Sequence, residues 1–133
     1  MTSINRERLA ALADVLIPAA EGMPSASEAG VQREGLDRVL AARPDLEDQV
    51  MRVLSAAAGD PTEALRALQD DDAGFAALSL TVMGAYYTDA HVRELIGYPG
   101  QQYLPDLVTG EPDWDEAALA RVVARGPLYR PAP

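Results

Sequence analysis

Cysteine and lysine are absent from this sequence of 133 residues, and histidine occurs only once, at His91. Without cysteine, the chain can form no disulfide and offers no thiolate to a metal ion. With one histidine it also lacks the His-x-x-x-His and Glu-x-x-His patterns of common metal sites. We therefore expect this chain to bind no metal and no cofactor of its own.

Basic residues are also few, because 21 acidic side chains stand against 11 basic ones, all of them arginine. A net charge of −10 repels phosphate backbones, so nucleic acid is not expected as a partner. The same charge disfavours an anionic membrane surface. The longest weakly polar run lies within 73–87 and is shorter than the roughly 20 residues that span a bilayer. We expect no direct membrane insertion.

Targeting signals are not apparent either. The opening residues, MTSINRER, contain no basic segment followed by an apolar core, and the sequence has no Arg-Arg pair. These are the features of secretory and twin-arginine signals. We expect a cytoplasmic protein, or a periplasmic one if a leader has been removed.

Catalytic groups are equally hard to find. His91 would need an orienting partner and a nucleophile to act as a general base, and we interpret it as a partly exposed helix residue. The triplet Asp70-Asp71-Asp72 lacks the alternate spacing and the glycine turn of a calcium loop, so we interpret it as a solvated loop with Asp72 as a helix cap. No Gly-x-Gly-x-x-Gly or Walker loop is present. We assign no catalytic residue.

The stretch 72–100 is expected to organise the fold. Apolar residues mark two faces of a helix over 73–87, the first with Phe75, Leu78, Val82 and Ala85 and the second with Ala76, Leu80, Met83 and Tyr87. A helix that is apolar on more than one face is typical of a buried central helix. Gly84, in its middle, indicates the close approach of another helix.

A short helix over 90–96 is expected next, capped by Thr88 or Asp89. Val92 and Ile96 are four residues apart and would be buried together. Gly97 would end this helix, because glycine adopts the left-handed conformation without a clash of its β-carbon.

Four more helices are predicted before this stretch, each from a capping or proline signal. Their expected bounds are Thr2 or Ser3 to about Ile17, Ser25 or Ser27 to about Ala42, Pro44 to Gly59, and Pro61 to the residues before Asp70. The fold class predicted is all-α, a single compact domain of about six or seven short helices.

The C-terminal third is less regular. Residues 101–113 form a long loop without periodicity, and loops of this length often carry function. A last helix is expected between a cap at Asp113 or Asp115 and an end at Gly126, with a buried stripe of Ala118, Leu119, Val122 and Val123. The proline-rich tail, 127–133, would be extended. We divide the chain into a helical domain, 1–126, and this tail.

Most of the aromatic side chains lie in or beside this irregular third. Tyrosine and tryptophan are over-represented where proteins bury surface against a partner. The predicted partner interface consists of Tyr98, Pro99, Gly100, Tyr103, Leu104, Trp114 and Tyr129. The alternatives are that the aromatic rings fill the domain's own core and that the tail is a disordered end.

Two motifs carry a resemblance to a known family. The first is Tyr86-Tyr87-x-Asp89-x-x-Val92 followed by Ile96-Gly97-Tyr98-Pro99-Gly100, and the second is Leu12-Ala13-Asp14-x-Leu16-Ile17-Pro18 followed by Ala29-Gly30-Val31. Together they resemble the gluconate 2-dehydrogenase subunit 3 family in order and approximate separation. They cover about a third of the chain, and the glycine-flanked turn is the more specific of the two.

The resemblance implies a non-catalytic small subunit of a flavin-dependent sugar, polyol or alcohol dehydrogenase or oxidase. Its partner would be a large subunit of the glucose-methanol-choline type, which carries the FAD. Many members of the family carry a twin-arginine signal, and this sequence departs from that pattern. A self-sufficient helical binding module or homo-oligomer with the same fold is the alternative. An enzyme in its own right would need a catalytic group that the sequence does not offer.

Overall fold

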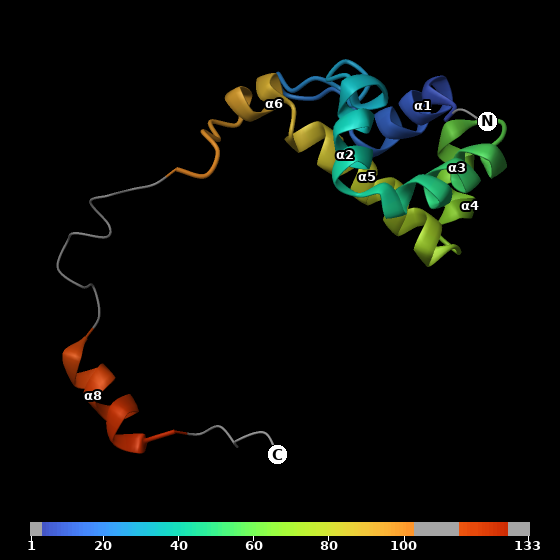
Figure 1. Ribbon diagram of the computed structural model, residues 1–133. Coiled ribbons are helices and arrows are strands. Elements are labelled where there is room, and N and C mark those ends of the chain that lie inside the picture. Colours follow the sequence, from blue (N-terminus) through green and yellow to red (C-terminus); the bar gives the residue numbers. More distant parts are fainter. Residues whose placement is uncertain (1–3, 103–114, 128–133) are drawn as a thin grey trace. The chain divides into compact units, whose positions relative to one another are not determined.

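The computed structural model describes residues 4–102 and 115–127, and its contacts divide the chain into two units, Met1–Gly100 and Gln101–Pro133 (Figure 1). The described residues form seven α-helices and no β-strand, which confirms the predicted all-α class. The proposed range of 1–126 for one domain spans the boundary between the two units and stays a prediction.

Six of the helices belong to the first unit. They are α1 (Arg6–Leu16), α2 (Leu36–Ala42), α3 (Glu47–Ala56), α4 (Pro61–Leu68), α5 (Asp72–Tyr87) and α6 (Ala90–Leu95). A π-helical turn, η1 (Val31–Gly35), precedes α2, and a 3-10 turn, η2 (Pro44–Leu46), precedes α3. The longest helix, α5, packs against α2, α3, α4, α6 and η1, as expected of a central helix (Figure 1).

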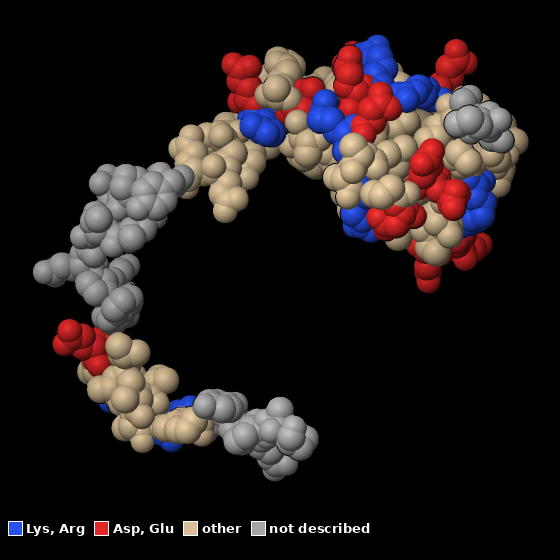
Figure 2. All heavy atoms as spheres, viewed as in Figure 1, with Lys and Arg blue, Asp and Glu red and all other residues tan. Residues whose placement is uncertain are grey.

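The core of the first unit forms around one face of α5. Leu78 and Val82 are fully buried there, beside Ala85. The other helices contribute mainly leucine and valine to the same cluster, including Leu9, Leu12, Leu36, Val50, Val53, Leu65 and Val92. Acidic and arginine side chains are interspersed over the visible outer surface of this unit (Figure 2). Burial of this apolar area is the main stabilising term of such a domain.

Three helices begin at the capping residues that the sequence predicted. Asp60 accepts hydrogen bonds from the backbone N–H groups of Thr62 and Glu63, both at 3.0 Å, and Pro61 occupies the first helical position. Asp89 caps α6 in the same way. In the second unit, Asp115 caps α8 (Glu116–Arg125) through the N–H of Ala117 at 2.9 Å. Each carboxylate satisfies backbone donors that have no partner inside the helix.

Two other caps were predicted at the wrong residue. Asn5, not Thr2 or Ser3, caps α1, because its side chain accepts the N–H of Arg8 at 2.9 Å. Asp71, not Asp72, caps α5 by accepting the N–H of Gly74 at 3.0 Å. In addition, α3 ends at Ala56 rather than at Gly59, since the next residue is already extended.

The predicted helix from Ser25 or Ser27 to Ala42 is interrupted. The capping box does form, because Glu28 Oε2 accepts the N–H of Ser25 at 2.7 Å and Ser25 Oγ accepts the N–H of Glu28 at 3.3 Å. The turn then stops at Gly30, which adopts φ +77°. Arg33 leaves the helical region at φ −108° and ψ −118°, so α2 begins only at Leu36.

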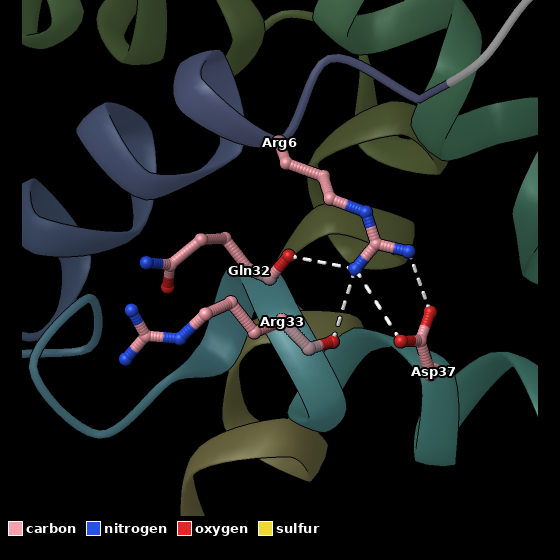
Figure 3. A network of polar contacts seen from close by, with 4 residues as sticks. All are labelled: Arg6, Gln32, Arg33 and Asp37. Carbon is pink, nitrogen blue, oxygen red and sulfur yellow. Dashed lines mark hydrogen bonds and ion pairs between the residues drawn. The ribbon is translucent and has the colours of Figure 1, made fainter.

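Arg6 holds this interruption in place from the neighbouring helix (Figure 3). Its Nη1 donates to the carbonyl oxygens of Gln32 and Arg33 at 2.9 and 3.1 Å. Its Nη2 donates to Asp37 Oδ1 at 2.6 Å. The Arg33 carbonyl also accepts the backbone N–H of Leu36, so the guanidinium adds a charge-assisted hydrogen bond there and a donor at Gln32.

The second apolar face of α5 was predicted to be buried, and this is wrong. Leu80, Met83 and Tyr87 are 42%, 47% and 52% exposed, because the neighbouring helices cover the face of Leu78 and Val82. The glycine prediction is confirmed, since a β-carbon at position 84 would lie only 3.3 Å from Val39 Cγ2 of α2.

Two smaller predictions of burial also fail. Ile96 is 48% exposed. The helix α6 has only six residues, and Val92 is the one that it buries in the core. The predicted stripe on α8 is exposed as well, at Leu119, Val122 and Val123. Residues 115–127 contain only this helix, so within the described part of the second unit nothing can cover its apolar side.

Candidate functional site

The two stretches that carry the family resemblance meet in the first unit. Tyr86, at the end of α5, is 2% exposed, and its hydroxyl donates to the carbonyl oxygen of Pro24 at 2.7 Å. The loop around Pro24 connects α1 to η1 and therefore lies inside the N-terminal motif. One buried phenol thus ties the N-terminal loop to the end of the central helix.

Asp14 fixes the same loop from α1. Its Oδ1 accepts the N–H of Ser27 at 2.7 Å and its Oδ2 accepts the hydroxyl of Ser27 at 2.6 Å. Burial alone would raise the pKa of Asp14, but these hydrogen bonds outweigh it and hold the pKa below its ordinary value. A carboxylate that stays ionised near pH 7 and has no histidine beside it is a structural acceptor rather than a general acid or base.

We expect Asp14→Asn to destabilise the protein by about 1–3 kcal/mol, because the amide cannot accept both hydrogen bonds as a charged group does. A folded-state pKa below the unfolded one means that this contribution is present above pH of about 4 and is lost as the pH falls further. Urea unfolding at pH 7 and at pH 3 measures both effects. A difference between wild type and variant that is equal at the two pH values would contradict the assignment.

The turn after α6 lies at the surface. Gly97 and Gly100 adopt φ +67° and +88°, which only glycine tolerates easily, and the N–H of Tyr98 donates to the carbonyl of Arg93 at 2.9 Å. The ring of Tyr98 is 52% exposed and lies 5.9 Å from the Arg93 guanidinium carbon. The predicted glycine-flanked turn is therefore present and presents its tyrosine to solvent.

The residues next to this tyrosine in the sequence are mostly apolar and exposed. Leu95 and Ile96 are 44% and 48% exposed, and Pro99 is exposed too. We call Leu95, Ile96, Tyr98 and Pro99 the turn surface; Leu95 ends α6, and the segment that follows α6 appears uncharged (Figures 1 and 2). Of the other predicted interface residues, Gly100 belongs to the same turn, whereas Tyr103, Leu104, Trp114 and Tyr129 lie outside the described residues.

A second apolar surface was not anticipated from the sequence. An open groove of about 260 Å³ runs between α2 and α5. We call it the α2–α5 groove, and its lining consists of Arg38, Val39, Ala42, Arg43, Leu46, Leu80, Gly84 and Thr88. The available signal was that α5 carries more apolar residues than one buried face requires, but we interpreted that excess as deeper burial.

Another open cavity, of about 420 Å³, lies among α1, α3 and α4. Half of its lining residues are alanines from positions 56 to 67, and Glu63 and Asp71 are the charged members. Asp71 is already engaged, since it caps α5 and pairs with Arg52 at 2.8 Å. The cavity therefore offers apolar contact but no converging set of polar groups.

Reactive chemistry is not assembled in the described residues. His91 is 68% exposed at its side chain, and its Nδ1 lies 4.0 Å from Glu94, which leaves it without a buried orienting partner. Within residues 4–102 and 115–127, no three side chains with metal-binding groups come together. No helix in those ranges has both the length and the apolar character needed to cross a membrane.

No protein-family model, curated protein or solved structure matches this chain. The resemblance to the gluconate 2-dehydrogenase subunit 3 family therefore depends on the two motifs alone. Its implications for function are proposals.

Proposed function

We propose that this chain is the non-catalytic small subunit of a flavin-dependent sugar, polyol or alcohol dehydrogenase or oxidase. It binds a large subunit of the glucose-methanol-choline type, and the FAD belongs to that partner. The observation that carries the proposal is the exposed turn surface. About half of the surface of Leu95, Ile96 and Tyr98 stays exposed to solvent and is free to contact a partner.

The two motifs have separate tasks in this proposal. Tyr86, Asp89 and Asp14 hold the scaffold, since each is engaged with backbone groups of the chain itself. The turn surface then binds the partner through apolar and aromatic contact. Binding stabilises the native partner by mass action, as any ligand of a native state does.

Co-expression with a flavoprotein of the glucose-methanol-choline type tests the proposal. We expect a stable complex with the wild type and binding at least tenfold weaker for Tyr98→Ala, because an exposed tyrosine at the centre of an interface is a typical hot spot. Val15→Ala is the matched control, since Val15 is 40% exposed but lies on α1. Absence of a wild-type complex, or equal affinities for the two variants, would refute the proposal.

The exposed apolar residues of α5 favour a second candidate, a homo-oligomer that needs no other partner. Size-exclusion chromatography of the chain expressed alone separates the two. A well-folded oligomer with no affinity for the flavoprotein supports the second candidate. A monomer that binds the flavoprotein supports the first.

A further inference from the structure

The exposed apolar residues of α5 follow a helical spacing. Leu80, Met83 and Tyr87 are separated by three and four residues, so they line up along one side of the helix. Each is between 42% and 52% exposed. An amphipathic helix binds a protein by laying its apolar face into an apolar groove, and this row extends the apolar surface beside one.

The shape of the α2–α5 groove fits a third helix. Gly84 has no side chain, and Thr88 turns its hydroxyl back to the carbonyl oxygen of Gly84 at 2.6 Å. Val39 of α2 packs closely against Gly84, since its Cγ2 would lie 3.3 Å from a β-carbon at position 84, and Leu80 and Ala42 line the groove with them. Low positions between raised side chains are what one helix offers to the side chains of another.

The two arginines that line the α2–α5 groove indicate which charge a binding partner should carry. Arg43 is already paired, because Asp45 accepts from its Nε and Nη2 at 2.8 and 2.7 Å. Arg38 is exposed and makes no ion pair with any residue that the structure describes. In a chain of net charge −10, an unpaired arginine at an apolar groove attracts an acidic side chain of an incoming segment.

We infer that the α2–α5 groove binds a helix of the partner subunit with apolar residues at spacings of three and four and an Asp or Glu facing Arg38. The apolar side chains of that helix contact Leu80, Met83 and Val39, and its carboxylate pairs with Arg38. This inference rests on the proposed function, since it requires a protein partner. It adds a second contact area, separate from the turn surface.

The experiment uses the full chain in the co-expressed complex described above. We expect Leu80→Lys and Met83→Lys each to weaken the complex at least tenfold. Each variant places a positive charge, in addition to that of Arg38, among apolar contacts that the complex would bury. Arg38→Glu should weaken it severalfold, and the loss should shrink as salt is raised. The matched control is Val15→Lys, which makes the same charge change at an equally exposed apolar residue of α1. Circular dichroism confirms that each variant is folded.

A photo-cross-linker at position 83 identifies the occupant directly. A cross-link to one helical, acidic segment of the flavoprotein supports the inference. A wild-type complex that depends on Tyr98 but tolerates all three groove variants overturns the inference and leaves the proposed function standing. If no complex forms with the wild type, both fail. A homodimer that Leu80→Lys converts to a monomer would identify a second copy as the occupant and would also overturn it.

Discussion

Replacing Tyr86 by alanine is expected to lower the free energy of unfolding by about 3–5 kcal/mol, enough to leave much of the chain unfolded at 37 °C. The side chain is 2% exposed at the end of the central helix, and its loss would leave a cavity among α5 and the loop after α1. The variant would also leave the Pro24 carbonyl oxygen without its donor. Urea unfolding followed by circular dichroism measures the change.

Two variants separate the causes of this effect. Tyr86→Phe keeps the ring and removes only the hydroxyl, so we expect a loss of about 1 kcal/mol. Tyr87→Ala changes the neighbouring tyrosine, which is 52% exposed and meets Tyr86 edge-to-face at 5.2 Å, and we expect a loss of no more than about 1.5 kcal/mol. Equal losses for the two alanine variants would contradict the assignment of Tyr86 to the core.

The pH dependence gives an independent check on Tyr86. Burial raises the pKa of this phenol above its ordinary value of 10.0. A raised pKa in the folded state means that the contribution is complete below pH of about 10 and is lost as the pH rises through the folded-state pKa. Wild type should therefore lose stability in this alkaline range more steeply than Tyr86→Phe.

Local signals in the sequence were sufficient to predict three of the seven described helix starts. Asp60, Asp89 and Asp115 cap helices as predicted, because each precedes a helix former and can reach the next N–H groups within its own segment. The cap of α5 was missed by one residue, at Asp71, since three consecutive aspartates are chemically equivalent. Cap position there depends on where the helix meets α3, where Arg52 pairs with the Asp71 carboxylate at 2.8 Å.

Interactions between distant segments could not be predicted in the same way. At the interruption around Gly30 and Arg33, Arg6 donates to the carbonyl groups of residues 26 and 27 positions away. The contact from Tyr86 to Pro24 spans 62 residues. Periodicity describes one helix at a time, so neither contact leaves a signal in it. The residues predicted for the interface were chosen by composition, and Tyr98 and Pro99 are at the surface as that choice requires.

The two apolar faces of α5 show most clearly what sequence periodicity cannot predict. Sequence periodicity finds both faces equally apolar, and the hydrophobic effect alone would bury both. The helices that the structure describes in the first unit cover one face, so Leu78 is fully buried and Leu80 is 42% exposed. An apolar residue that the fold does not bury gains little from the hydrophobic effect in the isolated chain. In our proposal, the exposed residues of α5 contribute instead to the binding free energy of the complex, through contact with the partner helix.

Leu78→Ala and Leu80→Ala form a matched pair that tests this division. The same atoms are removed from the same helix two positions apart. We expect Leu78→Ala to lower the free energy of unfolding by about 2–5 kcal/mol, because it leaves a cavity in the core. We expect Leu80→Ala to change it by no more than about 1 kcal/mol, because solvent already reaches that side chain.

Binding to the flavoprotein should reverse the order of the two variants. Leu80→Ala is expected to weaken the complex severalfold, whereas Leu78→Ala should bind as the wild type does at temperatures where it stays folded. The two readouts, unfolding of the isolated chain and affinity for the flavoprotein, then move independently. If Leu80→Ala destabilised the isolated chain as much as Leu78→Ala, the second face of α5 would belong to the core. The α2–α5 groove would then not be a free surface.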